Sequence, residues 1–332
     1  MKIVFKIFIS LVIIFLLIFI FSRGHIYDKK ELEYGLTFSK KQAQNLGLDW
    51  QKVYLDIFND LKVKKIRLPA YWNEIEISKN QYFWDDMDWQ IEQAEKAHAE
   101  VILAVGGRLP RWPECHFPEW VNNITKEQRE EAILVYVKNV IERYKNKQSI
   151  KIWQIENEPF LSHFGSCPTL NSKFLDQEIA LAKSLDSRPI MVTDSGELSL
   201  WVSSAMRADI FGTSIYLHTY SKLFKNYIDY PITPAFFRLK KNLAGIFAHP
   251  KEWIVIELQA EPWGKSPYQN LTQAERERTM NLEKFRDIID FSSKTGFRQF
   301  YLWGVEWWYW EKEKNNNQAL WEEAKMLFKD VR

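Results

Sequence analysis

The sequence predicts a (β/α)8 barrel, in which eight parallel strands close into a ring and helices surround it. Short apolar, β-branched runs occur eight times and alternate with longer amphipathic stretches, the pattern of repeated strand–helix units. The length of 332 residues suits this fold, because such barrels typically need about 250 residues plus loop insertions. A doubly wound open sheet is disfavoured, since no glycine-rich phosphate-binding turn follows the first run.

Each element is expected at a definite place in the chain. The expected strands are residues 34–39, 64–70, 100–107, 150–158, 188–196, 209–217, 252–260 and 298–306. The expected helices are residues 48–62, 84–99, 125–146, 170–186, 272–296 and 317–331. No linker rich in glycine, serine or proline interrupts the series, so we expect one catalytic domain over residues 34–332, after a short connector over residues 24–33.

The N-terminus carries a long uncharged run, IFISLVIIFLLIFIF, from Ile7 to Phe21. With the Lys6 side chain reaching toward the lipid headgroups, this stretch approaches the ~20 residues that cross a bilayer. A cleaved signal peptide has a shorter apolar region and small residues at its cleavage site. We therefore expect an uncleaved transmembrane signal anchor over residues 1–23, with the catalytic domain extracytoplasmic. Secretion after cleavage is the alternative.

Composition excludes some classes of partner. The 45 basic and 43 acidic residues give a net charge of +2, which is no signature of nucleic-acid binding. The aromatic fraction of 15% suits a core and also faces that stack on sugar rings. The six histidines form no metal-binding motif. We expect a monomer that acts on an oligosaccharide or polysaccharide without a metal or organic cofactor.

Polar residues fall at the ends of the predicted strands, where the active sites of this fold lie. Seven residues at these ends are candidates: Arg67, Asn157, Glu158, Tyr216, His218, Glu257 and Trp303.

Glu158 and Glu257 are the pair most suited to catalysis, because they follow strands on opposite sides of the barrel. A retaining glycosidase needs two carboxyl groups about 5 to 5.5 Å apart, one as nucleophile and one as acid and then base. Arg67 would hold Glu257 ionised, and the charge of Glu257 would raise the proton affinity of Glu158.

The motif WQIENEP at residues 153–159, with a strand-seven glutamate about a hundred residues later, resembles the clan of retaining (β/α)8 glycoside hydrolases, clan A. This clan includes the cellulase and β-mannanase family 5 and the β-galactosidase family 42. The resemblance covers the chain from about Tyr34 onward. It implies that Glu158 is the acid/base and Glu257 the nucleophile.

The resemblance also implies roles around these two carboxyl groups. Asn157 would hydrogen-bond the sugar 2-hydroxyl, and Arg67 would match the strand-two arginine of the clan. Tyr216 would lie beside the nucleophile, and Trp303 would form the strand-eight sugar platform.

Two further glutamates remain open. Glu261, in ELQAEPWG, is the reserve nucleophile, although its place before Pro262 favours a loop with a structural or binding role. Glu156 alternates with Glu158 and either points the same way or pairs with a basic residue. The third strand also departs from the clan, since GGRLPRWPECHFPEW replaces the His-centred pattern of many relatives.

Several other residues near the predicted mouth are candidates for substrate binding. Trp72, Trp112, Trp263 and Trp307 follow strands, and some of them are expected to supply sugar subsites, although packing under a loop is the favoured role for any single one. His218 is expected to donate a hydrogen bond to substrate, with a structural role as its alternative.

Cys115 and Cys167 follow the third and fourth strands, which are neighbours in a barrel. A disulfide between these two loops is therefore a hypothesis. Together, the observations predict a retaining hydrolase of a β-linked glycan. A transglycosylase that remodels a surface polysaccharide and a non-catalytic carbohydrate-binding barrel are the alternatives.

Overall fold

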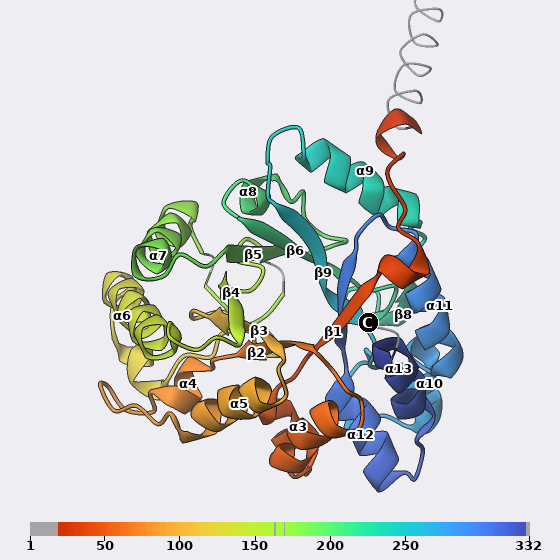
Figure 1. Ribbon diagram of the computed structural model, residues 1–332, viewed down its shortest axis with the longest axis horizontal. Coiled ribbons are helices and arrows are strands. Elements are labelled where there is room, and N and C mark those ends of the chain that lie inside the picture. The colour runs from red at the N-terminus through yellow and green to blue at the C-terminus, as the bar shows by residue number, and fades with distance from the viewer. Residues whose placement is uncertain (1–18, 163, 169, 330–332) are drawn as a thin grey trace, which may run out of the picture.

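The computed structural model describes residues 19–162, 164–168 and 170–329, and it forms a closed parallel barrel (Figure 1). Around the ring the strands follow the order β1-β10-β9-β6-β5-β4-β3-β2. Their bounds are Glu33–Thr37 for β1, Lys65–Pro69 for β2, Glu100–Val105 for β3, Ile150–Ile155 for β4, Ile190–Asp194 for β5, Ile210–Ile215 for β6, Glu252–Gln259 for β9 and Gln299–Trp303 for β10. Each lies within, or within one residue of, a predicted run, so the predicted fold class is confirmed.

Helices surround the ring of strands (Figure 1). They are α2 Lys40–Asn45, α3 Trp50–Asn59, α4 Trp72–Ile75, α5 Asp85–Lys96, α6 Lys126–Tyr144, α7 Ser172–Leu185, α8 Val202–Ala205, α9 Pro234–Ala244, α10 Gln273–Thr279, α11 Leu282–Ser293, α12 Val305–Lys314 and α13 Ala319–Lys329. Short 3₁₀ turns are η1 Lys29–Glu31, η2 Glu119–Asn123 and η3 Tyr268–Asn270. The outer helices bury their apolar sides against the strands, which makes the main core.

The strands are buried because helices cover the outside of the barrel and side chains fill its inside. Every residue of β5 and β6 is buried. A smaller apolar cluster, separate from the main core, is formed by Ile102, Met191, Ile210, Ile254, Ile256 and Tyr301. These layers fix the strand ends at which the polar candidates lie.

Some elements differ from the expected ones. A hairpin of β7 His218–Ser221 and β8 Asn226–Asp229 follows β6, and α9 follows the hairpin. The helix expected over residues 272–296 is divided, because Met280 and Asn281 are extended and the Asn281 side chain caps α11.

The structure leaves the predicted membrane anchor untested. Residues 1–18 of that segment lie outside the described part of the chain. Among the residues that are described, no helix combines the length and the apolar character needed to cross a bilayer.

Candidate active site

Arg67, in β2, lies at the centre of the site and is fully buried. Its Nε donates to Gln154 Oε1 at 2.8 Å, and its Nη2 donates to Asn157 Oδ1 at 2.7 Å. Its Nη1 donates to Glu257 Oε1 at 2.8 Å. One guanidinium therefore joins β2 to the end of β4 and to β9, with charge-assisted bonds that fix the orientation of each partner.

Glu257, near the end of β9, receives two hydrogen bonds. Besides the bond from Arg67, the Tyr216 hydroxyl donates to Glu257 Oε2 at 2.9 Å. Both donors fix the orientation of the carboxyl group, and the arginine places an opposite charge beside it. The structure thus brings Glu257 together with the two residues, Arg67 and Tyr216, that were expected beside it.

The backbone at Glu158 no longer has the strand conformation, because its φ is +44°. Its N–H donates to Thr193 Oγ1 on β5 at 2.9 Å, and its Oε1 accepts from the Ser214 hydroxyl on β6 at 3.3 Å. Ser214 is the register partner of Glu257 in the neighbouring strand β9. The Glu158 side chain therefore lies beside the strand that carries the other glutamate.

Burial, followed by the negative charge of Glu257, raises the pKa of Glu158 well above its usual value. No arginine donates to Glu158, among the contacts of the described residues, whereas Glu257 has Arg67. The two carboxyl groups therefore differ in environment, since the pKa of Glu158 is raised and Glu257 is paired with a cation.

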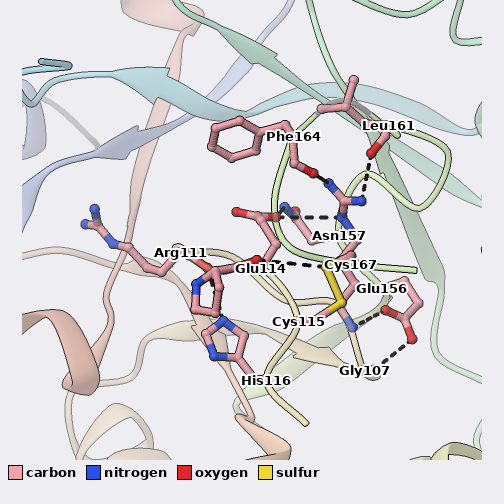
Figure 2. Close-up of a disulfide and its surroundings, with 12 residues drawn as sticks. Gly107, Arg111, Glu114, Cys115, His116, Glu156, Asn157, Leu161, Phe164 and Cys167 are labelled. Atoms are coloured by element: carbon pink, nitrogen blue, oxygen red, sulfur yellow. Dashed lines mark hydrogen bonds and ion pairs between the residues drawn. A yellow bond between two sulfur atoms is a disulfide. The ribbon is translucent and has the colours of Figure 1, made fainter. Parts of the chain in front are cut away.

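Glu156 does not share the direction of Glu158. Its carboxylate accepts from the backbone N–H groups of Gly107 at 2.7 Å and Arg108 at 2.5 Å (Figure 2). Gly106 has φ of +141°, and a Cβ there would lie 2.5 Å from Glu156 Oε1, so glycine is needed for this approach. Glu156 thus holds the loop after β3 instead of facing the mouth or pairing with a basic side chain.

Asn157 contacts a carboxyl group that sequence reasoning missed. Its Nδ2 donates to Glu114 Oε2 at 3.0 Å (Figure 2). Burial raises the pKa of Glu114 to about 8. Its place beside Cys115 in the loop after the third strand was a signal that it lies near the mouth.

The loops after β3 and β4 are joined by a disulfide between Cys115 and Cys167 (Figure 2). The two Cα atoms are 5.3 Å apart. Arg108 adds hydrogen bonds from Nη1 to the Leu161 carbonyl at 2.7 Å and from Nη2 to the Phe164 carbonyl at 2.9 Å. One wall of the site is thereby fixed by a covalent bond and a buried cation.

Glu261, the reserve nucleophile, is held by other groups. It forms an ion pair with Arg111 and accepts from the Trp303 indole N–H at 2.9 Å. The Arg111 guanidinium also lies 4.1 Å from the centre of the Trp303 ring, and its Nη2 donates to Glu306 at 2.6 Å. These contacts orient the expected sugar platform, Trp303, and they give Glu261 a positioning role. Arg111 and Glu306 were not foreseen.

Trp72 does not lie at the mouth, which corrects its assignment as a substrate-binding residue. It is fully buried and stacks on Tyr136 at 5.4 Å between ring centres. Its indole N–H donates to Glu76 at 2.7 Å. Trp307 is also buried, with its ring 6.4 Å from that of Tyr268, so packing accounts for its position.

Aromatic rings form a row that leads from the surface to Glu257. Trp112 is 56% exposed and lies 6.0 Å from Phe164. Phe164 lies 5.4 Å from Trp263, which in turn lies 5.0 Å from Tyr216, all measured between ring centres. Tyr216 donates to Glu257, so a series of ring contacts connects the exposed Trp112 to the proposed nucleophile.

His218 begins the β7–β8 hairpin, and its contacts favour its structural alternative. Nδ1 lies 2.7 Å from Asp229 on β8, and the backbone N–H donates to Gln259 Oε1 at 3.0 Å. The imidazole thus joins the two strands of the hairpin.

Known proteins resemble this chain both in sequence and in fold. The sequence model of glycosyl hydrolase family 10 matches residues 27–177, which run from before β1 into α7 and include Glu158. Over this stretch, which is less than half of the chain, the chain is similar to the glycosyl hydrolases of family 10. The motif WQIENEP resembled a clan that includes families 5 and 42, whereas the matching model is that of family 10. No curated protein sequence matches this chain.

Several solved structures share the fold of this chain at low sequence identity. Xylanase 10B of Thermotoga maritima is 15% identical, with a TM-score of 0.55, over 91% of this chain and 97% of the xylanase. Xylanase 10B of Thermotoga petrophila RKU-1, solved with xylobiose, is 15% identical, with a TM-score of 0.54, over 93% of this chain and 100% of the other. A family 42 β-galactosidase from G. stearothermophilus is 12% identical, with a TM-score of 0.62, over 90% of this chain and 56% of its own.

Proposed function

We propose that the protein hydrolyses a β-linked glycan of the xylan type, with Glu257 as nucleophile and Glu158 as acid/base. The difference between the environments of the two carboxyl groups carries this proposal, because Arg67 and Tyr216 donate to Glu257 while burial raises the pKa of Glu158. The substrate class rests on the family 10 match over residues 27–177 and on the likeness to two xylanases.

The reaction proceeds in two displacements. Glu257 attacks the anomeric carbon while the glycosidic C–O bond breaks, and Glu158 gives its proton to the departing oxygen. The sugar is then bound to Glu257 as an ester. Glu158, now ionised, takes a proton from water, and that water attacks the anomeric carbon and releases Glu257 as a carboxylate.

The remaining groups bind and orient the sugar. Asn157 faces the sugar 2-hydroxyl from an amide that Arg67 and Glu114 hold. Trp303 supplies a platform whose orientation Arg111 and Glu261 fix.

The proposed location is the outer side of a membrane, with the barrel carried by an N-terminal anchor. The uncharged run before residue 22 supports an anchor, and a disulfide suits an oxidising exterior. An enzyme placed there meets polysaccharides outside the cell.

The proposal is tested by assaying the full chain against xylan, mannan, glucan and galactan and against aryl β-xylosides, together with two variants. Glu158→Ala should lose most activity on xylan yet retain activity on aryl xylosides whose leaving group needs no proton, and added azide should restore turnover. Glu257→Ala should be inactive on both, whereas the matched control Glu261→Gln should keep the chemistry and mainly raise KM.

Three outcomes would contradict the proposal. Full activity of a folded Glu257→Ala variant excludes that residue as nucleophile. Activity confined to a polysaccharide other than xylan would show that the proposed substrate class is wrong. Products longer than the substrate, at high acceptor concentration, identify a transglycosylase.

A further inference from the structure

The end of α9 exposes large apolar side chains on the outside of the barrel. Leu243, Ile246 and Phe247 are 43%, 52% and 63% exposed. The N–H of Ile246 donates to the Leu243 carbonyl at 3.2 Å and that of Phe247 to the Ala244 carbonyl at 3.0 Å, so the helical turn continues past the last residue of α9. Residues three and four apart share one side of such a turn.

The other side of α9 is already used by the core. Phe237 and Ala244 are buried, and the Phe237 ring contacts Phe291 of α11. A helix on the surface of a barrel needs one apolar side. An additional exposed apolar cluster indicates a second contact.

The N-terminal part of the chain is bound beside this cluster. Asn242 Nδ2 donates to the carbonyls of Phe21 at 2.7 Å and Arg23 at 2.6 Å. Arg238, one turn earlier on α9, donates from Nε to the Ser22 carbonyl at 2.8 Å. In Figure 1 the first described residues, in red, lie next to α9 at the edge of the molecule.

The sequence that precedes Ser22 indicates what contacts the exposed apolar cluster of α9. The uncharged apolar run from Ile7 extends to Phe21, whose carbonyl Asn242 binds. A run of this length and composition partitions into the hydrocarbon of a bilayer. The bilayer must then lie next to the end of the run, and therefore next to the exposed side chains of α9.

We propose that Leu243, Ile246 and Phe247 insert into the lipid surface from which the N-terminal run emerges, so that α9 holds the barrel against the membrane. This inference rests on the proposed membrane location. Arg23, Arg238 and Lys241 lie beside the contact, and basic groups there attract anionic headgroups.

The contact leaves the active site accessible. Helices of a (β/α)8 barrel run opposite to the strands, so the C-terminal end of α9 lies at the end of the barrel away from the mouth. Lipid bound at that end does not cover Glu158 or Glu257. A polysaccharide can therefore enter from the side facing away from the membrane.

The two cysteines are joined to each other, so one introduced cysteine can be labelled selectively. Full chains carrying Ile246→Cys or Phe247→Cys are labelled with a fluorophore and reconstituted into vesicles of phosphatidylcholine and phosphatidylglycerol. Val135→Cys on α6 is the matched control, because Val135 is 45% exposed and α6 lies on another side of the barrel (Figure 1).

Replacing the lipids with spin-labelled ones should reduce the fluorescence at positions 246 and 247 at least twofold and leave that at position 135 unchanged. If vesicle-bound protein loses the same fraction of its fluorescence to spin-labelled lipids at all three positions, the α9 contact is overturned and the membrane location is not. A full chain that does not float with vesicles would overturn the membrane location and the contact together. Neither result affects the hydrolase assignment, which the polysaccharide assay tests separately.

Discussion

A single buried arginine distinguishes the two glutamates. Arg67 donates to Glu257 and to the Asn157 side chain, while Glu158, the residue after Asn157, has the Ser214 hydroxyl on its Oε1. The division of roles between the two glutamates therefore depends on which carboxyl group has a cation.

Glu257→Gln should lower the pKa of Glu158, because it removes the negative charge that helps to raise it. A downward shift of about one pH unit or more is expected. It can be measured by NMR titration of the ¹³C-labelled glutamate carboxyl groups, with Glu158→Gln used to assign the signal. An unchanged Glu158 titration in folded Glu257→Gln would show that the two groups do not interact.

For single residues, the sequence predicted those whose side-chain direction follows from their position at the end of a strand, such as Arg67, Tyr216 and Glu257. It failed where the backbone leaves the strand. Glu156 has φ of +57°, which turns its side chain toward the loop after β3 although strand alternation placed it with Glu158. Trp72 likewise belongs to a short helix after β2 that packs inward.

Among the elements, the loops after β3 and β4 contribute most to the site. The disulfide joins them, and Glu114, next to Cys115, contacts Asn157. The position of the Asn157 amide therefore depends on a covalent bond between two loops.

Replacing both cysteines by serine should destabilise the protein and disturb this wall. The bridged residues are 52 apart, and closure of a loop of this size is worth about 2 to 4 kcal/mol of unfolding free energy. Urea unfolding of the double variant beside the oxidised parent measures the loss, and KM for the glycan should rise. Equal urea midpoints and equal KM would show that the bridge supports neither stability nor the site.

Periodicity located the elements but not all of their ends. Residues 272–296 have one continuous amphipathic pattern, yet Asn281 accepts from the Lys284 N–H at 2.8 Å and starts a new helix. That cap competes with helix continuation, and the pattern alone does not reveal which arrangement has the lower free energy. The β7–β8 hairpin has four-residue strands too short for a clear alternation.

For the whole molecule, buried carboxyl groups at the mouth make stability depend on pH. The pKa of Glu114 is raised to about 8 by burial, so between pH 6.5 and 8 the folded protein holds a proton that the unfolded chain has released. Stability must then fall as pH rises, by about 1.4 kcal/mol per pH unit for one such group. Burial lowers the pKa of His116 to about 3. This group therefore changes the stability only below pH 6.5 and does not oppose the trend.

Glu114→Gln should make the unfolding free energy less dependent on pH in this window, because glutamine keeps an acceptor for Asn157 without a titrating proton. Urea unfolding at pH 6.5, 7.2 and 8.0 compares the two slopes. The same slope in parent and variant would mean that Glu114 is not the titrating group.

The most direct test of the account is to identify the residue that carries the sugar between the two displacements. A 2-fluoro xylobioside with a good leaving group slows release of the ester, because fluorine destabilises the positive charge that develops at the anomeric carbon. Peptide mass spectrometry should find the sugar on the peptide that contains Glu257 and assign it to Glu257. An adduct on Glu261, or continued turnover without any adduct, would contradict the assignment.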